Sequence, residues 1–199
     1  MPQGHVHDRI TLWSLPLIAG GTFVVSRDGN LTLLISGGFL FGGLMFGPDL
    51  DIYSRQYKRW GWLRWIWLPY QRMLRHRSFW SHGPLVGTFL RIVYLGFWCG
   101  LFGAIGLWIA HDFTDIEPVK QWVVQTVRQS LQTHPFEYFA LYLGLEVGAM
   151  SHSMSDWSHS AYKRWRAGGW AGLLNQPKTA RRSASPSLKT LKTKPDKNK

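Results

Sequence analysis

Residues 84–110, PLVGTFLRIVYLGFWCGLFGAIGLWIA, decide the fold class of this chain. The stretch is apolar throughout apart from a single charged residue, Arg91. A helix needs about 20 mostly apolar residues to cross the hydrocarbon core of a bilayer. The stretch therefore predicts a membrane-spanning helix, and the alternative is a helix buried in a soluble bundle.

Three further apolar segments cover residues 10–25, 31–48 and 136–150. The first two carry no charge, whereas the third contains Glu137 and Glu146. All three are somewhat short for a span, which keeps the soluble bundle open as an alternative. Together with residues 84–110 they predict an all-α integral membrane bundle of about four spanning helices, in a plasma or thylakoid membrane.

The basic residues are distributed unevenly between the two sides of this topology. Lys and Arg concentrate in residues 51–82 and after Tyr162, while the opposite side carries Arg27, Lys120 and Arg128. Cytoplasmic loops of membrane proteins hold the excess of Lys and Arg. Both termini and the central loop are therefore expected in the cytoplasm.

The central loop is also rich in aromatic residues, and these alternate with cations. This composition predicts a segment that lies among lipid headgroups, and an aromatic soluble core is the alternative. The aromatic residues are Tyr53, Tyr57, Trp60, Trp62, Trp65, Trp67 and Tyr70.

Residues 112–133 carry apolar side chains at helical spacing, which predicts an amphipathic surface helix. Small residues let helices approach closely in lipid, so Gly38-x3-Gly42 and Gly43-x3-Gly47 predict a packing face.

The net charge of +12 and the pI near 10.2 imply an anionic partner. Much of the positive charge lies in residues 176–199, which contain no aromatic residue and are expected to be disordered. The sequence thus predicts a membrane domain at 1–175 and a basic tail at 176–199. Anionic lipid headgroups are the favoured partner of this tail, and nucleic acid is the disfavoured rival. Cys99 is the only cysteine, so an intrachain disulfide is excluded.

Histidine and aspartate cluster at the ends of the apolar segments. The clusters are His7-Asp8, Asp49-x-Asp51, His76-x5-His82 and His152-x3-Asp156. In the predicted topology all four lie on the cytoplasmic side, so we expect them to converge. Imidazole and carboxylate together favour Zn²⁺, with Mn²⁺ or Fe²⁺ as alternatives. The sequence therefore predicts a divalent metal site at the cytoplasmic interface.

Each of these residues also has an ordinary structural explanation. Asp8 and Asp49 could cap helices, and His82 and His152 could be buried histidines with satisfied hydrogen bonds. A Ser-His-Asp triad that uses Ser81, Ser151 or Ser155 is disfavoured because no G-x-S-x-G motif is present.

The motifs of the chain resemble those of a known family. They are Gly4-x2-His7-Asp8-Arg9, Gly47-Pro48-Asp49-Leu50-Asp51, His76-Arg77-Ser78-x2-Ser81-His82-Gly83-Pro84 and Gly148-x3-His152-x3-Asp156-Trp157. In combination they resemble uncharacterised metal-binding membrane proteins common in cyanobacteria. They are also similar, more broadly, to inner-membrane metal-dependent hydrolases described as LexA-binding. The resemblance covers roughly residues 4–160 and implies a bound metal and hydrolysis, without implying a substrate.

Taken together, these observations predict a metal-dependent hydrolase that acts on a phosphate or acyl ester at the cytoplasmic face of the membrane. The expected metal ligands are His7, Asp49, Asp51, His76, His82, His152 and Asp156. His76 and Asp8 are expected either to bind the metal or to orient its ligands, and a spare aspartate could act as a general base. Asp8 and Arg77 are the expected catalytic residues, and Arg77, with Arg75, is expected to hold an anionic group. The alternative is a non-catalytic, metal-stabilised scaffold that recruits a membrane protein complex through its basic surface.

Overall fold

The computed structural model describes residues 4–76, 78–111 and 115–174, in which every regular element is a helix and no β-strand occurs. The predicted all-α class is confirmed. In chain order the elements are α1 (Gly4–Ser26), α2 (Gly29–Leu44), η1 (Pro48–Asp51), α3 (Arg55–Arg59), η2 (Gly61–Ile66), α4 (Trp67–Met73), α5 (Phe79–His82), α6 (Val86–Ala110), α7 (Glu117–Thr133) and α8 (Pro135–Leu174).

The chain divides into two compact units, residues 1–161 and 162–199. The first unit contains α1 to α7, the N-terminal part of α8 and the candidate metal ligands. In the second unit α8 departs from helical geometry at Gly168 and Gly169. Gly169 has φ +57°, a left-handed conformation that glycine adopts at little cost. The predicted tail at 176–199 lies outside the described residues, and the domain division at residue 175 stays a prediction.

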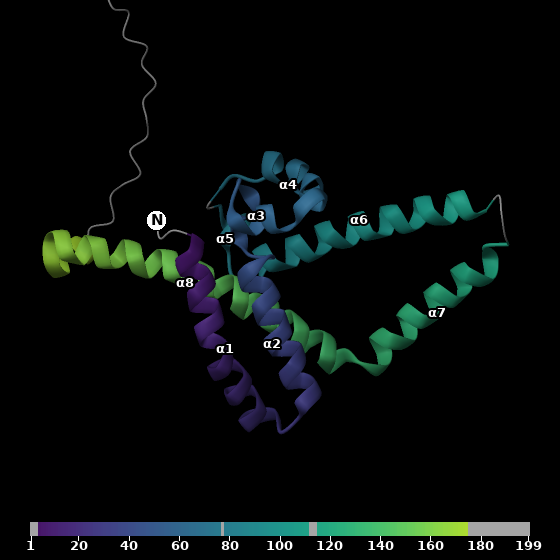
Figure 1. Cartoon of the computed structure of the whole chain (residues 1–199), viewed down its shortest axis with the longest axis horizontal. Helices are drawn as coiled ribbons and strands as arrows, with labels where there is room; N and C mark the ends of the chain where they lie inside the picture. The colour runs from purple at the N-terminus through teal and green to yellow at the C-terminus, as the bar shows by residue number, and fades with distance from the viewer. Residues whose placement is uncertain (1–3, 77, 112–114, 175–199) are drawn as a thin grey trace, which may run out of the picture. The chain divides into compact units, whose positions relative to one another are not determined.

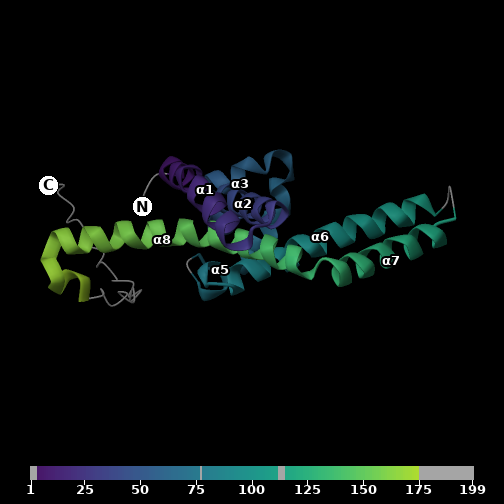
Figure 2. The ribbon, with the colours of Figure 1, turned by 90° about the horizontal axis from the view of Figure 1, so that it is seen from below.

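Helices α1 and α2 form an antiparallel hairpin, which is seen side by side in both views (Figures 1 and 2). The turn is fixed by Asp28, whose carboxylate accepts hydrogen bonds from the backbone N–H groups of Asn30 at 2.7 Å and Leu31 at 3.1 Å. Such N-caps satisfy amide donors that the first helical turn leaves unpaired. The hairpin brings the start of α1 beside the end of α2, as the contact of Gly43 with Thr11 confirms.

Helix α2 packs against α8 through glycines on both helices. A Cβ atom at Gly42 would collide with the backbone of Leu145, and one at Gly148 would collide with the backbone of Phe39. Gly38 and Gly144 make equivalent close approaches to the facing helix. The predicted Gly38-x3-Gly42 packing face is therefore confirmed. Its partner, Gly144-x3-Gly148 on α8, was not identified from the sequence.

Three helical segments are long and apolar enough to cross a membrane: His5–Ser26, Gly29–Asp51 and Val86–Ala110. Their outer faces carry large exposed apolar side chains, including Trp13, Leu17 and Trp108. The fourth predicted span, residues 136–150, forms part of α8. It does not meet the same criterion of length and hydropathy within the described residues.

The aromatic segment between residues 53 and 70 divides into a buried and an exposed set. Tyr57, Trp67 and Tyr70 belong to the main hydrophobic core with Phe46 and Leu50. The expectation that the whole segment lies among headgroups was therefore wrong for these three residues. Tyr53, Trp62 and Trp65 are exposed, and their location among headgroups stays a prediction. The predicted surface helix is also confirmed, because α7 buries none of its residues; residues 112–114 of the predicted range lie outside the described chain.

Candidate metal centre

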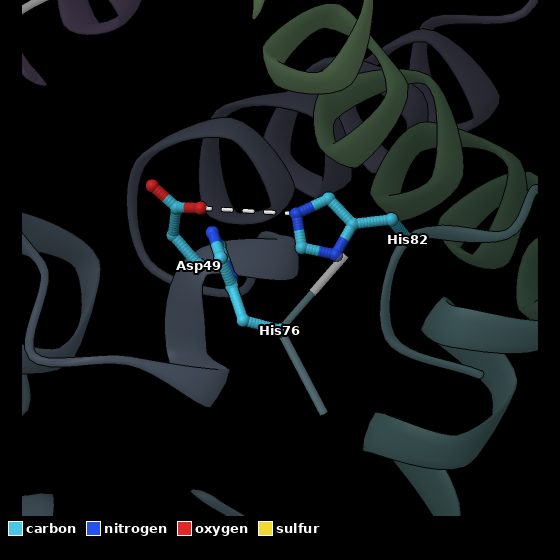
Figure 3. A group of neighbouring side chains, drawn as sticks. All are labelled: Asp49, His76 and His82. Carbon is cyan, nitrogen blue, oxygen red and sulfur yellow. Dashed lines mark ion pairs between the residues drawn. The ribbon is translucent and has the colours of Figure 1, made fainter. Parts of the chain in front are cut away.

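Asp49 lies at the centre of a group of potential metal ligands. It belongs to η1, the short helix that follows Gly47 and Pro48 at the end of α2. One ligand atom each of Asp49, His76 and His82 lies within 4.8 Å of the other two. Figure 3 shows the three side chains pointing toward one another, with His82 Nε2 3.9 Å from Asp49 Oδ1. Two histidines six positions apart thus reach the same carboxylate.

Asp51 lies behind this group and orients His76. Its Oδ1 atom is 2.9 Å from His76 Nδ1, and its side chain is fully buried. A carboxylate that binds one imidazole nitrogen fixes the ring and makes the other nitrogen available to a metal. Asp51 was predicted as a direct ligand, but its position is that of a residue that orients a ligand.

Ser81 and its neighbours position His82. Ser78 caps α5 by accepting from the backbone N–H of Ser81, which starts the short helix that ends in His82. The hydroxyl of Ser81 donates to Asp51 Oδ2, and its Oγ atom lies 2.8 Å from His82 Nδ1. His82 Nε2 therefore faces Asp49, and sequence reasoning considered Ser81 only as a nucleophile.

Burial lowers the pKa of His82 below its ordinary value of 6.5. The charge of Asp51 opposes this effect, and the adjacent imidazole of His76 adds to it. The lowered pKa favours the neutral imidazole, which is the form that binds a metal ion.

His7 and His152 lie on the other side of Asp49. His152 Nε2 is 3.0 Å from Asp49 Oδ2, and the His7 and His152 rings have centroids 4.0 Å apart at an interplanar angle of 32°. Both histidines are 5% exposed. His152 is thus brought to the same carboxylate as His82, with His7 beside it, so segments far apart in the sequence converge here as predicted.

Asp8 is held by two arginines. Its carboxylate accepts hydrogen bonds from Arg55 at 3.1 Å and from Arg59 at 2.9 and 2.8 Å. Arg59 also donates to the carbonyl of Leu44 at 2.7 Å, so it connects α1, α2 and α3. Arg77 and the side chain of Asp156 lie outside the described residues.

Arg91 and Glu146 support the segment that carries His82. Arg91 is 1% exposed and donates to the carbonyl of Ser81 at 3.1 Å. Glu146 accepts from the backbone N–H of Leu85 at 2.9 Å. Leu85 has φ +63°, which is strained for a residue with a Cβ atom. The sequence signal that points to Arg91 is its position as the only charged residue in an apolar segment. A charged side chain in such a segment marks a functional site or has a charged partner.

A Ser-His-Asp hydrolase site is not supported by this geometry. Ser81 has no exposed surface, so its hydroxyl is out of reach of a substrate. It also contacts the same nitrogen of His82 that faces Asp51, whereas in a triad the histidine lies between the serine and the carboxylate.

The donor set fits a divalent transition metal. Asp49 Oδ1 is buried and has no hydrogen-bond partner within the described part of the chain. A buried acceptor without a partner is costly unless something satisfies it. One carboxylate oxygen and two oriented imidazoles form a ligand set of the kind found in zinc enzymes. Asp49, His76 and His82 are thus the residues that could hold the ion.

Comparisons with known proteins also indicate metal binding, without naming residues. A family described as "Uncharacterized metal-binding protein (DUF2227)" matches residues 2–166. An uncharacterized protein of Aquifex aeolicus is 37% identical over 59 residues, which are 29% of this chain and 41% of that relative. The match thus spans less than half the length of that relative. No solved structure matches the chain significantly.

Proposed function

This chain belongs to the family of uncharacterized metal-binding proteins, and we propose that it is a membrane-embedded, metal-dependent hydrolase. Its substrate in this proposal is a phosphate or acyl ester at the cytoplasmic face of the membrane. Zn²⁺ is the proposed metal, with Mn²⁺ or Fe²⁺ as alternatives, because imidazole and carboxylate suit these ions.

The observation that carries the proposal is the orientation of His76 and His82 toward Asp49. Asp51 and Ser81 bind the Nδ1 side of the two rings. A structural site is closed by four protein ligands, whereas a catalytic site has three and keeps a position for water or substrate. The group of three at Asp49 supports the catalytic type.

The centre is also within reach of a substrate. The side chains of His76 and His82 are 29% and 18% exposed. A bound ion would lower the pKa of a bound water and polarise the ester oxygen. The role of the protein residues is to orient the ligands and the substrate. Asp51 keeps the His76 ring in place, and Ser81 keeps the His82 ring in place. Arg75, exposed beside His76, attracts an anionic ester.

The membrane location rests on exposed apolar surface. In α6 the most apolar stretch buries none of its residues within the chain. Contiguous apolar surface of this extent needs lipid or a partner to cover it. We propose that α1, α2 and α6 span the bilayer and that the first half of α8 completes a bundle of four. The basic residues of α3 to α4 would then lie at the cytoplasmic headgroups.

Asp8 contacts Arg55 and Arg59, which favours a role in tying α1 to α3 over a role as catalytic base. A catalytic role for Arg77 is retained as part of the proposal, since Arg77 follows His76 directly in the sequence.

Hydrolysis assays of the detergent-purified full chain test the proposal. Chromogenic phosphate monoesters, phosphate diesters and acyl esters would be compared with and without chelation of the metal. We expect one class to be cleaved only by the metal-loaded protein, and Asp49→Asn to abolish both cleavage and metal binding. Asp115→Asn, an exposed position away from the centre, is the matched control and should change neither. Stoichiometric metal with no cleavage of any ester class would instead favour the non-catalytic scaffold.

A further inference from the structure

The two carboxylate oxygens of Asp49 face two different pairs of histidines. Oδ1 is the oxygen nearer His82, at 3.9 Å from Nε2. Oδ2 is the oxygen nearer His152, at 3.0 Å from Nε2. Asp49 therefore lies between the pair His76 and His82 and the pair His7 and His152. The centre described above uses only the first pair.

The second pair is buried, and His152 has a ring nitrogen available as a ligand. His152 is 5% exposed, and its Nδ1 has no hydrogen-bond partner among the residues that the structure describes. Its Nε2 lies 3.0 Å from Asp49 Oδ2. The ring of His7 lies against that of His152, with centroids 4.0 Å apart.

A small cavity lies at this second pair. It has a volume of about 20 Å³ and is lined by His7, Asp49 and His152, together with Asp8 and Gln56. A site needs roughly 10–15 Å³ on this measure to hold one water molecule. The cavity is thus large enough for one water molecule or one metal ion.

We propose that the protein binds two divalent ions and that Asp49 bridges them. One ion lies between Asp49 Oδ1, His76 and His82, and the other between Asp49 Oδ2, His7 and His152. Each ion then has two imidazoles and one shared carboxylate, which leaves positions for water and substrate. In two-metal enzymes the ions lie about 3.5–4 Å apart, a separation that a bridging carboxylate sets. This inference extends the proposed function, because it rests on the metal centre at Asp49.

Metal counting tests the second ion without any assay of activity. The full chain in detergent would be equilibrated with Zn²⁺ and its metal content measured by elemental analysis. We expect two ions per chain for the wild type and one for His152→Ala and His7→Ala. His134→Ala is the matched control, because His134 is 53% exposed and pairs with Glu137; it should keep two ions.

Mn²⁺ provides an independent readout. Two Mn²⁺ ions joined by a carboxylate couple magnetically, so the wild type should lack the hyperfine-split spectrum of isolated Mn²⁺. His152→Ala should restore that spectrum. Circular dichroism of each variant verifies that it is folded.

The possible outcomes separate this inference from the proposed function. One ion per wild-type chain, whichever histidines hold it, overturns the two-ion centre and leaves the single-ion hydrolase intact. No bound ion in the wild type overturns both. The wild-type count is decisive even if an alanine variant does not fold.

Discussion

Asp51 Oδ1 lies 2.9 Å from His76 Nδ1, while Asp51 Oδ2 accepts the hydrogen bond of Ser81, which itself contacts His82. One fully buried carboxylate therefore orients both half-buried histidines of the metal centre. This relationship separates the roles of two aspartates that stand two positions apart in the sequence. Asp49 faces His76 and His82 as a fellow ligand, and Asp51 holds these two histidines in their orientation.

The two aspartates should respond differently to substitution. Asp51→Asn is expected to weaken metal binding by about 10- to 100-fold, because it removes the partner that orients His76. Asp49→Asn should abolish binding altogether. Titration with Zn²⁺ against a competing chelator measures both. Equal losses in the two variants would mean that Asp51 is itself a ligand.

Ser81→Ala should affect both stability and metal affinity. The substitution leaves Asp51 Oδ2 without its buried donor, and an unsatisfied buried acceptor costs about 1–3 kcal/mol or more when charged. It also frees the His82 ring, so affinity should fall. Thermal unfolding with and without Zn²⁺ measures the two effects. Ser151→Ala, which removes only a hydrogen bond to the Gly148 carbonyl within α8, is the control.

Acidification should destabilise the metal-free protein in a defined range. The pKa of His82 is lowered by burial, so below pH 6.5 the unfolded chain binds a proton that the folded chain does not. Stability therefore falls as the pH decreases through 6.5. Chemical denaturation of the metal-free protein between pH 5 and 8 measures this slope, which should be reduced in His82→Gln. An NMR titration should place His82 below 6.5, and a midpoint above 6.5 would contradict the prediction.

The contact between α2 and α8 should not tolerate a side chain at Gly42. Gly42→Ala places a methyl group against the backbone of Leu145, and overpacking of this kind costs about 1–3 kcal/mol. The separation of Asp49 and His152 should increase at the same time, which would lower metal content. Gly37→Ala in the same helix meets nothing within 4 Å and is the matched control. Similar melting temperatures for the two variants would contradict the packing argument.

Cys99 offers a direct test of membrane insertion. It is the only cysteine and is exposed in α6. If α6 spans the bilayer, a charged maleimide should not label Cys99 in sealed or broken membrane vesicles and should label it once the protein is denatured. Met73→Cys in a Cys99→Ser background, at a position 76% exposed, should be labelled in the broken vesicles. Rapid labelling of Cys99 in native vesicles would exclude a spanning α6.

The sequence predicted the helical class and the convergence of the histidines on Asp49. It could do so because His7, Asp49, His82 and His152 each stand close to the end of an apolar segment of the sequence, although α8 itself continues well beyond His152. It could not predict which aspartate binds and which orients. That distinction depends on the η1 turn, which sends Asp49 and Asp51 in different directions.

The sequence also did not reveal which aromatic residues are buried. Trp62 and Trp67 have similar neighbours in the sequence, yet they are 79% and 0% exposed. The difference arises from the succession of short helices η2 and α4, whose bends follow no simple period. The pairing of Asp8 with Arg59 joins residues far apart in the sequence, so no local pattern could have identified it.

The contact of α2 with α8 bears on how the metal centre responds to lipid bilayers of different thickness. At Gly42 and Gly148 one main chain touches the other, so no rotamer change can alter the spacing. If these helices span a bilayer as proposed, lipids of another chain length would tilt or shift whole helices. The close contact of α2 with α8 would still keep Asp49 beside His152. The distances between the ligands of the metal centre should therefore not depend on bilayer thickness. Its affinity for metal should be the same in thin and thick membranes.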